Sequence, residues 1–294
     1  MSDQLPLLTT PTFDIPKLSI LDTRRKEWKE RKQWWLSTHN IQSELGRNLE
    51  RGNRAVFSID GSEARPSIFD PVLTELMYKW FTISSGSILD PFAGGSVRGI
   101  VAEELGYSYT GIELSPTQVE ANISQSSKPT WIVGDSNEVL DTLEDHQYDF
   151  LFSCPPYHDL EIYSDNPQDL SNMSWESFLT NYQSIISKSY TKMRDNTFAV
   201  FVVSEIREYN TKGRYTEGFY KQFIPSTISA FESAGFKFYN DIILINNAQA
   251  AAIISNAHFD RNRKVASVHQ NVLVFVKGNP DLATIKITRE EGVP

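Results

Sequence analysis

Short apolar runs alternate with longer amphipathic segments along most of this chain. Runs that suit buried β-strands lie at 88–90, 109–113, 130–133, 148–153, 198–203, 236–245 and 272–276. Segments with helical periodicity lie between them, at 95–105, 116–124, 136–144, 174–194 and 219–234.

This alternation predicts an α/β fold. Apolar strands that alternate with amphipathic helices form a mostly parallel sheet with helices on both faces. The last two strands have only a loop between them, so we expect them to pair as a terminal antiparallel hairpin. The expected sheet therefore has seven strands, six of them parallel and one antiparallel.

The first part of the chain has a different pattern. Residues 1–20 carry several prolines and no clear period, so we expect an extended arm. A helix is predicted at 22–37, where tryptophans among charged residues are more typical of packing than of base stacking. Another helix is predicted at 67–80, with Pro71 in its first turn. We expect an N-terminal extension with a helix at 1–64, a main domain at 65–280 and a C-terminal tail at 281–294.

Composition indicates a soluble protein without disulfides. The chain of 294 residues is 40% hydrophobic and 22% charged, which is ordinary for a globular protein. Cys154 is the single cysteine, so an internal disulfide is excluded and a reducing compartment is indicated. The N-terminus lacks the features of a signal peptide, and no apolar stretch is long enough to cross a bilayer. We therefore expect a cytoplasmic protein that does not enter a membrane.

The net charge of −9 argues mildly against binding to nucleic acid, which depends on Lys and Arg. A local basic face can nevertheless bind phosphates while acidic residues lie elsewhere. Basic residues gather in three places, which are 24–32, 212–221 and 261–264. The plain interpretation of such a group is a solvated surface.

Two of the strand runs end in turns of unusual composition. The first breaks into a glycine-bearing turn at 90–96 (DPFAGGS), and the fourth ends in Cys-Pro-Pro-Tyr at 154–157. Glycine lets the backbone approach a ligand closely, and paired prolines make a stiff rim. Glu113 and Asp135 close the second and third strands, and ligands of such sheets bind outside the carboxyl ends of the strands. The Gly-x-Gly-x-x-Gly spacing is absent, which disfavours a nucleotide-dependent oxidoreductase.

Together the two turns resemble motifs I and IV of the S-adenosylmethionine-dependent DNA amino-methyltransferases, which methylate adenine N6 or cytosine N4. The resemblance implies a Rossmann-like methyltransferase fold, with residues 65–280 as the catalytic domain. It implies that Asp90 lies near the methionine amino group, Glu113 at the ribose and Asp135 at the adenine. The implied S-adenosylmethionine-binding residues are Asp90, Pro91, Phe92, Gly94, Gly95, Ser96, Glu113, Asp135 and Ser136.

The catalytic residues implied by the same resemblance are Ser153, Cys154, Pro155, Pro156 and Tyr157. In the family, Asp, Asn or Ser precedes the prolines and accepts hydrogen bonds from the target amine, while the aromatic residue stacks on the flipped base. No metal is needed, because catalysis is mostly alignment. Here Cys154 takes that position, and a thiol is a weak acceptor. Ser153 stands one residue earlier, although strand alternation points it to the opposite face.

This departure leaves alternatives open. Adenine N6 is slightly favoured over cytosine N4 as the target. A cytosine C5 methyltransferase would use Cys154 as a covalent nucleophile, although His158 is the only basic residue nearby to activate the thiol. An RNA or protein-glutamine N-methyltransferase also has a Pro-Pro-Tyr turn, typically with Asn before it. A catalytically degenerate DNA-binding module is the non-enzymatic alternative.

Recognition of DNA is expected to come from segments inserted between the predicted elements. These segments lie at 158–165, directly beyond the catalytic turn, at 205–219 and at 246–270. The predicted substrate-binding residues are His158, Arg261, Arg263, Lys264 and His269. From about Arg65 to Gly278 the chain is similar to small stand-alone methyltransferases of phages and mobile elements, which places it in a bacterial or phage-infected host cell. Neither the oligomeric state nor a cognate restriction nuclease is indicated by the sequence.

Overall fold

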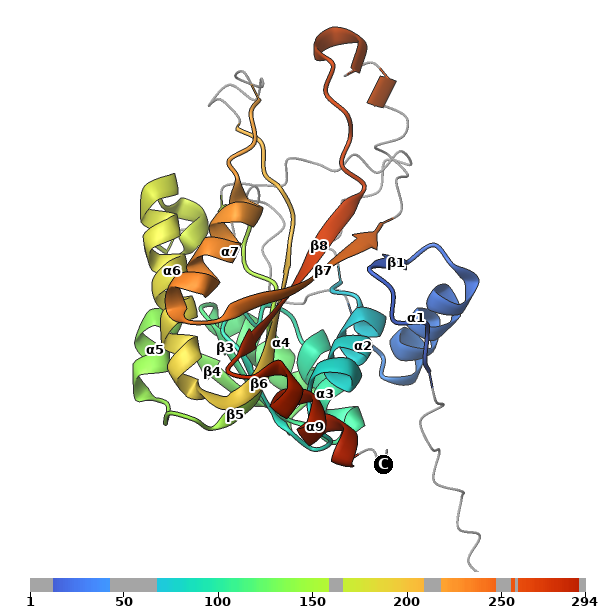
Figure 1. Ribbon diagram of the computed structural model, residues 1–294, viewed down its shortest axis with the longest axis vertical. Coiled ribbons are helices and arrows are strands. Elements are labelled where there is room, and N and C mark those ends of the chain that lie inside the picture. The colour runs from blue at the N-terminus through green and yellow to red at the C-terminus, as the bar shows by residue number, and fades with distance from the viewer. Residues whose placement is uncertain are drawn as a thin grey trace, which may run out of the picture.

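The computed structural model describes residues 13–42, 68–158, 166–208, 218–246, 255–256 and 259–290 (Figure 1). Its strands are β1 (Ile20–Asp22), β2 (Ser87–Asp90), β3 (Ser108–Glu113), β4 (Thr130–Val133), β5 (Tyr148–Ser153), β6 (Met193–Val203), β7 (Lys237–Ile245) and β8 (His269–Lys277). Its helices are α1 (Lys26–Thr38), α2 (Pro71–Phe81), α3 (Val97–Leu105), α4 (Pro116–Gln125), α5 (Ser136–Thr142), α6 (Trp175–Lys192), α7 (Phe223–Ala234) and α9 (Pro280–Glu290). A short 3-10 turn spans Leu170–Asn172.

The described strands form one sheet in the order β1-β7-β8-β6-β5-β2-β3-β4. In it, β8 lies between β6 and β7 and runs antiparallel to both, while every other pairing is parallel. The prediction of a Rossmann-like methyltransferase fold with a terminal antiparallel hairpin is confirmed. The expected number of strands was one too low, because β1 extends the edge of the sheet by pairing with β7. Only Leu21 of the three residues in β1 is buried, so the sequence around it shows no apolar run that would predict a strand.

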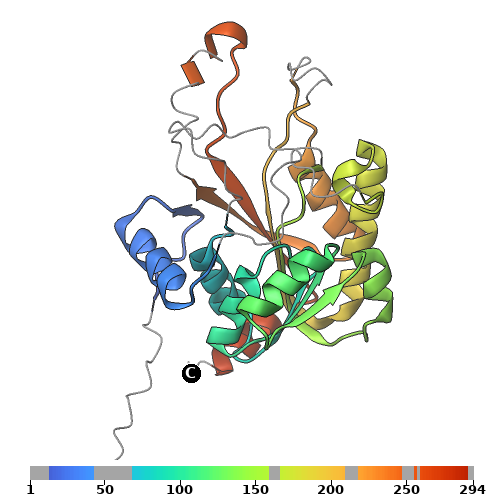
Figure 2. The same ribbon diagram turned by 180° about the vertical axis from the view of Figure 1, so that it is seen from behind.

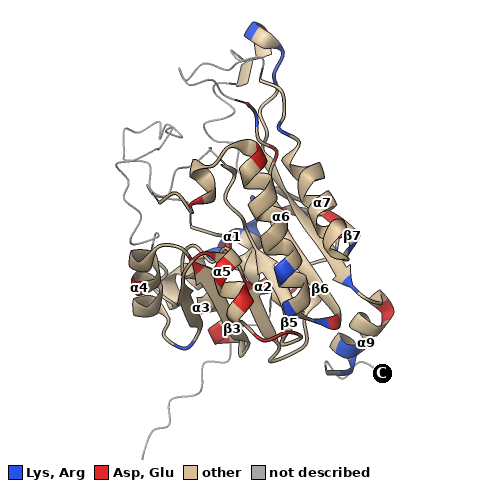
Figure 3. Cartoon of the chain, turned by 90° about the vertical axis from the view of Figure 1, so that its left-hand side faces the viewer, with Lys and Arg blue, Asp and Glu red and all other residues tan. Residues whose placement is uncertain are grey.

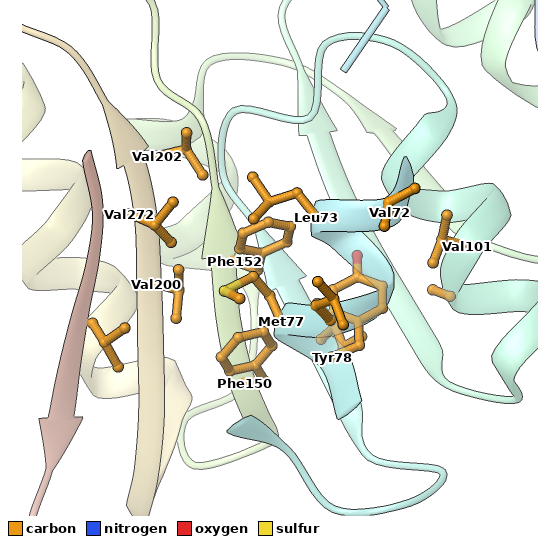
Figure 4. Packing of buried hydrophobic residues seen from close by; sticks show 14 of the residues in the cluster. Val72, Leu73, Met77, Tyr78, Val101, Phe150, Phe152, Val200, Val202 and Val272 are labelled. Atoms are coloured by element: carbon orange, nitrogen blue, oxygen red, sulfur yellow. The ribbon is translucent and has the colours of Figure 1, made fainter. Parts of the chain in front are cut away.

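Alternation along the strands divides the core between the two faces of the sheet. Phe150 and Phe152 belong to the cluster under α1, α2, α3 and α9, whereas Leu151 faces α5, α6 and α7. The two helical layers are visible on opposite sides of the sheet in Figure 2. Figure 4 shows Met77 and Tyr78 of α2 packed against Phe150 and Phe152 of β5. This packing fixes β5, and therefore the turn that follows it.

The N-terminal segment is attached to the sheet domain through α2. Arg31 of α1 donates to both carboxylate oxygens of Glu75, at 2.7 and 2.8 Å, and Trp35 Nε1 donates to the same side chain. Both residues of the ion pair are buried. The predicted boundary between 64 and 65 lies outside the described residues. In the predicted C-terminal tail, α9 packs Ala283 and Ile287 into the core.

Four neighbouring strands end at one edge of the sheet, at Asp90, Glu113, Val133 and Ser153. The described parts of the segments between β6 and α7 and between β7 and β8 extend beyond this edge (Figure 1). The residues at which these two segments leave the sheet therefore lie beside the turns at 90–96 and 154–157.

Candidate active site

A cavity of about 280 Å³ lies at the carboxyl ends of β2, β3, β4 and β5. Its size is near the lower end of the range for small-molecule sites, and its wall mixes carboxylates with apolar side chains. Of the predicted cofactor residues, the cavity is lined by Pro91, Phe92, Gly94, Glu113, Asp135 and Ser136. Of the predicted catalytic residues, it is lined by Cys154 and Pro156. The acids and the proline turn thus share one cavity.

Backbone donors fix Glu113 and Asp135, the two carboxylates that the sequence placed at the cofactor site. Gly94 has a φ of 54° and donates its N–H to Glu113 Oε2 at 2.9 Å, so the glycine-bearing turn folds onto the end of β3. The N–H of Ser115 donates to Glu113 Oε1 at 2.9 Å. Asp135 caps α5 by accepting from the N–H of Asn137 at 2.8 Å. Each acid therefore has a defined position in the cavity wall.

Asp90 lies behind the cavity wall. It is fully buried and accepts from the Arg98 guanidinium, from Tyr109 Oη at 2.7 Å and from Ser153 Oγ. Arg98 also donates to the carbonyl oxygens of Phe92 and Ala93, at 2.6 and 2.8 Å. These contacts form the Asp90 network, made of Asp90, Arg98, Tyr109 and Ser153. Asp90, Gly95 and Ser96 do not line the cavity, so the network supports the glycine-bearing turn at 90–96 from behind the cavity wall.

The charges in the Asp90 network stabilise one another. Burial works to lower the pKa of Arg98, but the Asp90 carboxylate, together with Tyr109 and Cys154, raises it, and the net shift is upward. Burial raises the pKa of Tyr109, and the negative charge of Asp90 raises it further. Both groups therefore remain in their protonated forms, and Asp90 is surrounded by donors.

The turn at 154–157, which the sequence predicts to be catalytic, has a different environment. Pro155 is buried, while Cys154, Pro156 and Tyr157 are half-buried. The Tyr157 hydroxyl lies 3.7 Å from Cys154 Sγ and accepts from Gln270 Nε2 at 2.8 Å, and its ring contacts Phe223. Tyr157 lies beside the cavity without lining it. Ser153, which the sequence suggested as a substitute acceptor, is instead buried and bonded to Asp90.

The structure places His158 away from the cavity. Its side chain is 6% exposed and packs edge-on against the stacked rings of Trp175 and Phe178. Its Nε2 is 2.9 Å from the carbonyl oxygen of Met173, and its Nδ1 is 2.8 Å from Nζ of Lys221. These partners assign the proton to Nε2, because a carbonyl only accepts and an ammonium only donates. His158 is therefore held by Met173 and Lys221 and does not line the cavity, and its contact with a substrate stays a prediction.

Arg261, Arg263 and Lys264 belong to the segment between β7 and β8, which projects from the sheet (Figure 3), and His269 is the first residue of β8. Arg261, Arg263 and His269 are exposed, and Lys264 is half-buried against Gly218. A side-chain carbon on Gly218 would overlap Nζ of Lys264, so the two projecting segments are in contact there. None of the predicted substrate-binding residues lines the cavity. Parts of the predicted recognition segments lie outside the described residues, at 159–165, 209–217, 247–254 and 257–258.

Several residues of the site were not predicted. The sequence of the predicted helix at 95–105 gives no indication that Arg98 pairs with Asp90. Gln270 was included in the predicted recognition segment 246–270, without a role of its own. The segment 166–170 contributes to the cavity wall without any sequence pattern.

Among the described residues, no group of His, Cys, Asp and Glu could hold a metal ion. No described helix is long and apolar enough to cross a membrane.

Comparisons with known proteins add limited information. No protein-family model and no curated protein matches the chain. Among solved structures, it is similar to the [4+2]-cyclase SpnF (12% identity, TM-score 0.49, 71% of this chain and 82% of that one). It is also similar to a TehB-like SAM-dependent methyltransferase from Corynebacterium glutamicum (14% identity, TM-score 0.42, 72% of this chain and 89% of that one). A candidate DNA modification methylase from Thermus thermophilus, complexed with S-adenosyl-L-methionine, is similar over 50% of this chain and 52% of its own (16%, 0.37). Likenesses at this level carry no conclusion about activity or substrate.

Proposed function

We propose that this protein transfers a methyl group from S-adenosylmethionine to an exocyclic amine of a base in DNA, with adenine N6 ahead of cytosine N4. The observation that carries the proposal is the cavity that joins Glu113 and Asp135 to Cys154 and Pro156. A cofactor site next to a stiff aromatic-bearing turn is what methyl transfer to a base requires.

The residues of the cavity fit the cofactor. Glu113 is held at its wall by two backbone donors, where a carboxylate can accept the hydroxyls of a ribose. Asp135 stands at the neighbouring strand end, where it can accept from the adenine amino group. Phe92 and Leu170 supply apolar contact area. Bound S-adenosylmethionine would supply a methyl group on a sulfonium, which the target nitrogen takes by direct displacement.

Asp90 takes a positioning role in this proposal. The resemblance implied contact with the methionine amino group, but its carboxylate is surrounded by Arg98, Tyr109 and Ser153. Through Arg98 it holds the carbonyls of Phe92 and Ala93. We therefore assign Asp90 to the support of the cofactor turn.

The catalytic turn would align the target amine. The Pro155 carbonyl is the strong acceptor, and Cys154 in the cavity wall is the weaker one. The half-buried Tyr157 ring stands next to these atoms, where a flipped base can stack on it. The proton of the amine leaves to solvent, so alignment supplies most of the catalysis.

Methylation of cytosine C5 is the second candidate, because Cys154 lines the cavity. Covalent attack needs a thiolate, which a nearby base would have to generate. His158, the basic residue closest in sequence, is turned to Met173 and Lys221 instead. This geometry favours the amine over the ring carbon.

DNA as the substrate is supported by the projecting basic residues Arg261, Arg263 and Lys264, which can offset the net negative charge locally. We propose that the protein is a small cytoplasmic enzyme of the phage or mobile-element type.

The test is to incubate the full chain with methyl-labelled S-adenosylmethionine and, separately, DNA, RNA and a protein mixture. Label in DNA alone is expected. Label in RNA or protein would replace the proposed substrate. Cofactor binding by calorimetry without any transfer would indicate a degenerate module.

A further inference from the structure

A series of neutral hydrogen bonds connects the catalytic turn to the residues where the projecting segment between β7 and β8 begins and ends. Asn246 Nδ2 donates to Gln270 Oε1 at 3.2 Å, and Gln270 Nε2 donates to the Tyr157 hydroxyl at 2.8 Å. The hydroxyl lies 3.7 Å from Cys154 Sγ. We call these four residues the Tyr157 network.

The geometry gives this network a direction. Asn246 follows β7 and Gln270 is the second residue of β8, and the N–H of Asn246 donates to the carbonyl of Val268 at 2.9 Å. With its oxygen bonded to Asn246, the Gln270 amide presents its nitrogen to Tyr157. A hydroxyl oxygen that accepts from Gln270 can direct its own hydrogen to the sulfur of Cys154.

We propose that Gln270 is a positioning residue for the catalytic turn: it anchors the Tyr157 ring by its hydroxyl and turns the hydroxyl hydrogen toward Cys154. The inference rests on the proposed function, in which that ring carries the flipped base and that sulfur faces the target. It links the stem of the projecting segment to the reacting groups.

Gln270→Glu tests the direction of the network at almost constant shape. A carboxylate only accepts, so the Tyr157 hydroxyl would donate to it and turn its hydrogen away from Cys154. Cys154 is the only cysteine of the chain, so the rate of alkylation by iodoacetamide at a fixed pH reports on this sulfur alone. We expect Gln270→Glu to slow alkylation, because a thiolate loses a donor.

The added charge of the variant also slows alkylation, so it must be measured separately. The same substitution in a Tyr157→Phe background gives the effect of charge alone. We expect the slowing to be about twofold to tenfold larger in the tyrosine background, the range for one hydrogen bond. Equal slowing in the two backgrounds would overturn the assignment. This readout does not depend on the proposed methyl transfer.

Activity gives the second readout. Gln270→Glu should lower kcat for DNA methylation about tenfold while the Kd for S-adenosylmethionine stays unchanged, because Gln270 does not line the cofactor cavity. Gln147→Glu adds the same charge at an exposed position just before β5 and should leave kcat unchanged. A wild-type enzyme that methylates no DNA would reject the proposed function and leave the alkylation result to decide on Gln270.

Asn246→Asp is a second variant in case Gln270→Glu does not fold. A carboxylate at 246 can only accept, so the Gln270 amide would reverse and present its oxygen to Tyr157. The variant should reproduce the slow alkylation and the low kcat without touching Tyr157. Wild-type alkylation and wild-type kcat in a folded Asn246→Asp protein would contradict the inference.

Discussion

Two hydrogen-bond networks flank the cavity, and adjacent residues at the end of one strand belong to different ones. Ser153 donates to Asp90 in the Asp90 network, whereas Cys154 contacts Tyr157 in the Tyr157 network. Asp90 and Ser153 are fully buried, while Cys154 and Tyr157 are half-buried. Strand alternation thus sends the Ser153 side chain into the protein interior and the Cys154 side chain to the cavity wall.

The two networks also differ in charge. The Asp90 network encloses an ion pair, and removal of one partner leaves a buried charge uncompensated. The Tyr157 network is neutral and reaches solvent, so its members can be changed at low cost in folding. We therefore expect variants of the first to affect stability and variants of the second to affect turnover.

The largest effect is expected at Arg98. Arg98→Met removes the partner of Asp90 and two bonds to the cofactor turn, which should lower the free energy of unfolding by about 3–5 kcal/mol. Urea unfolding followed by circular dichroism measures this. Lys128→Met, which removes an exposed ion pair with Glu103, is the matched control and should cost at most about 1 kcal/mol. A similar loss of unfolding free energy in the two variants would mean that the Asp90 network does not contribute more to stability than an exposed ion pair.

Glu113 should affect cofactor binding more than folding. Glu113→Gln keeps the shape but replaces one acceptor oxygen by a donor, which faces the N–H of Gly94 or Ser115. The lost charge-assisted bonds are worth about 1.5–3 kcal/mol, so the Kd for S-adenosylmethionine should rise at least about tenfold. Calorimetric titration measures it, with Glu144→Gln, at an exposed position away from the cavity wall, as control. Unchanged affinity would remove Glu113 from the ribose site.

Substitutions in the Tyr157 network should change turnover and leave the fold intact. Tyr157→Ala removes a stacking surface worth about 1–3 kcal/mol and should lose most of the methyl transfer. Cys154→Ser replaces a weak thiol acceptor by a hydroxyl of similar size that accepts better, so it should retain substantial activity. Steady-state rates, with thermal unfolding as the check on folding, separate the two. An active Tyr157→Ala protein would mean that the base does not stack on this ring.

The basic segment gives a smaller, salt-dependent effect. Replacing Arg261, Arg263 and Lys264 by alanine should weaken DNA binding and lower the slope of log K against log salt by up to about three. Fluorescence anisotropy at several salt concentrations measures the slope. A slope equal to that of the wild type would mean that these side chains only face solvent.

The smallest effect concerns alkaline pH. The folded pKa of Tyr109 is raised by burial and by Asp90, while the unfolded value is about 10. Above that pH the unfolded chain loses a proton that the folded protein keeps, so stability falls as the pH rises. In Tyr109→Phe this decline should be shallower by about 1.4 kcal/mol per pH unit. Urea unfolding on both sides of pH 10 measures it, and an unchanged decline would mean that Tyr109 ionises in the folded state.

The sequence was most informative where structure depends on local pattern. Glu113 and Asp135 were placed correctly at strand ends, because apolar runs define where strands stop. Contacts between distant segments were not predictable: Gln270 reaches Tyr157 across 113 positions, and β1 joins β7 with one buried side chain. Proximity in sequence did not show where the His158 side chain lies: the residue follows the turn, but it has a φ of 47° and is buried.

The central claim is that Cys154, unlike Ser153, faces the reacting base without attacking it. The most direct measurement is mass spectrometry of nucleosides from DNA methylated in vitro by the wild type and by Cys154→Ser. We predict N6-methyldeoxyadenosine, or N4-methyldeoxycytidine, from both proteins. 5-Methyldeoxycytidine from the wild type, and no product from Cys154→Ser, would contradict the claim.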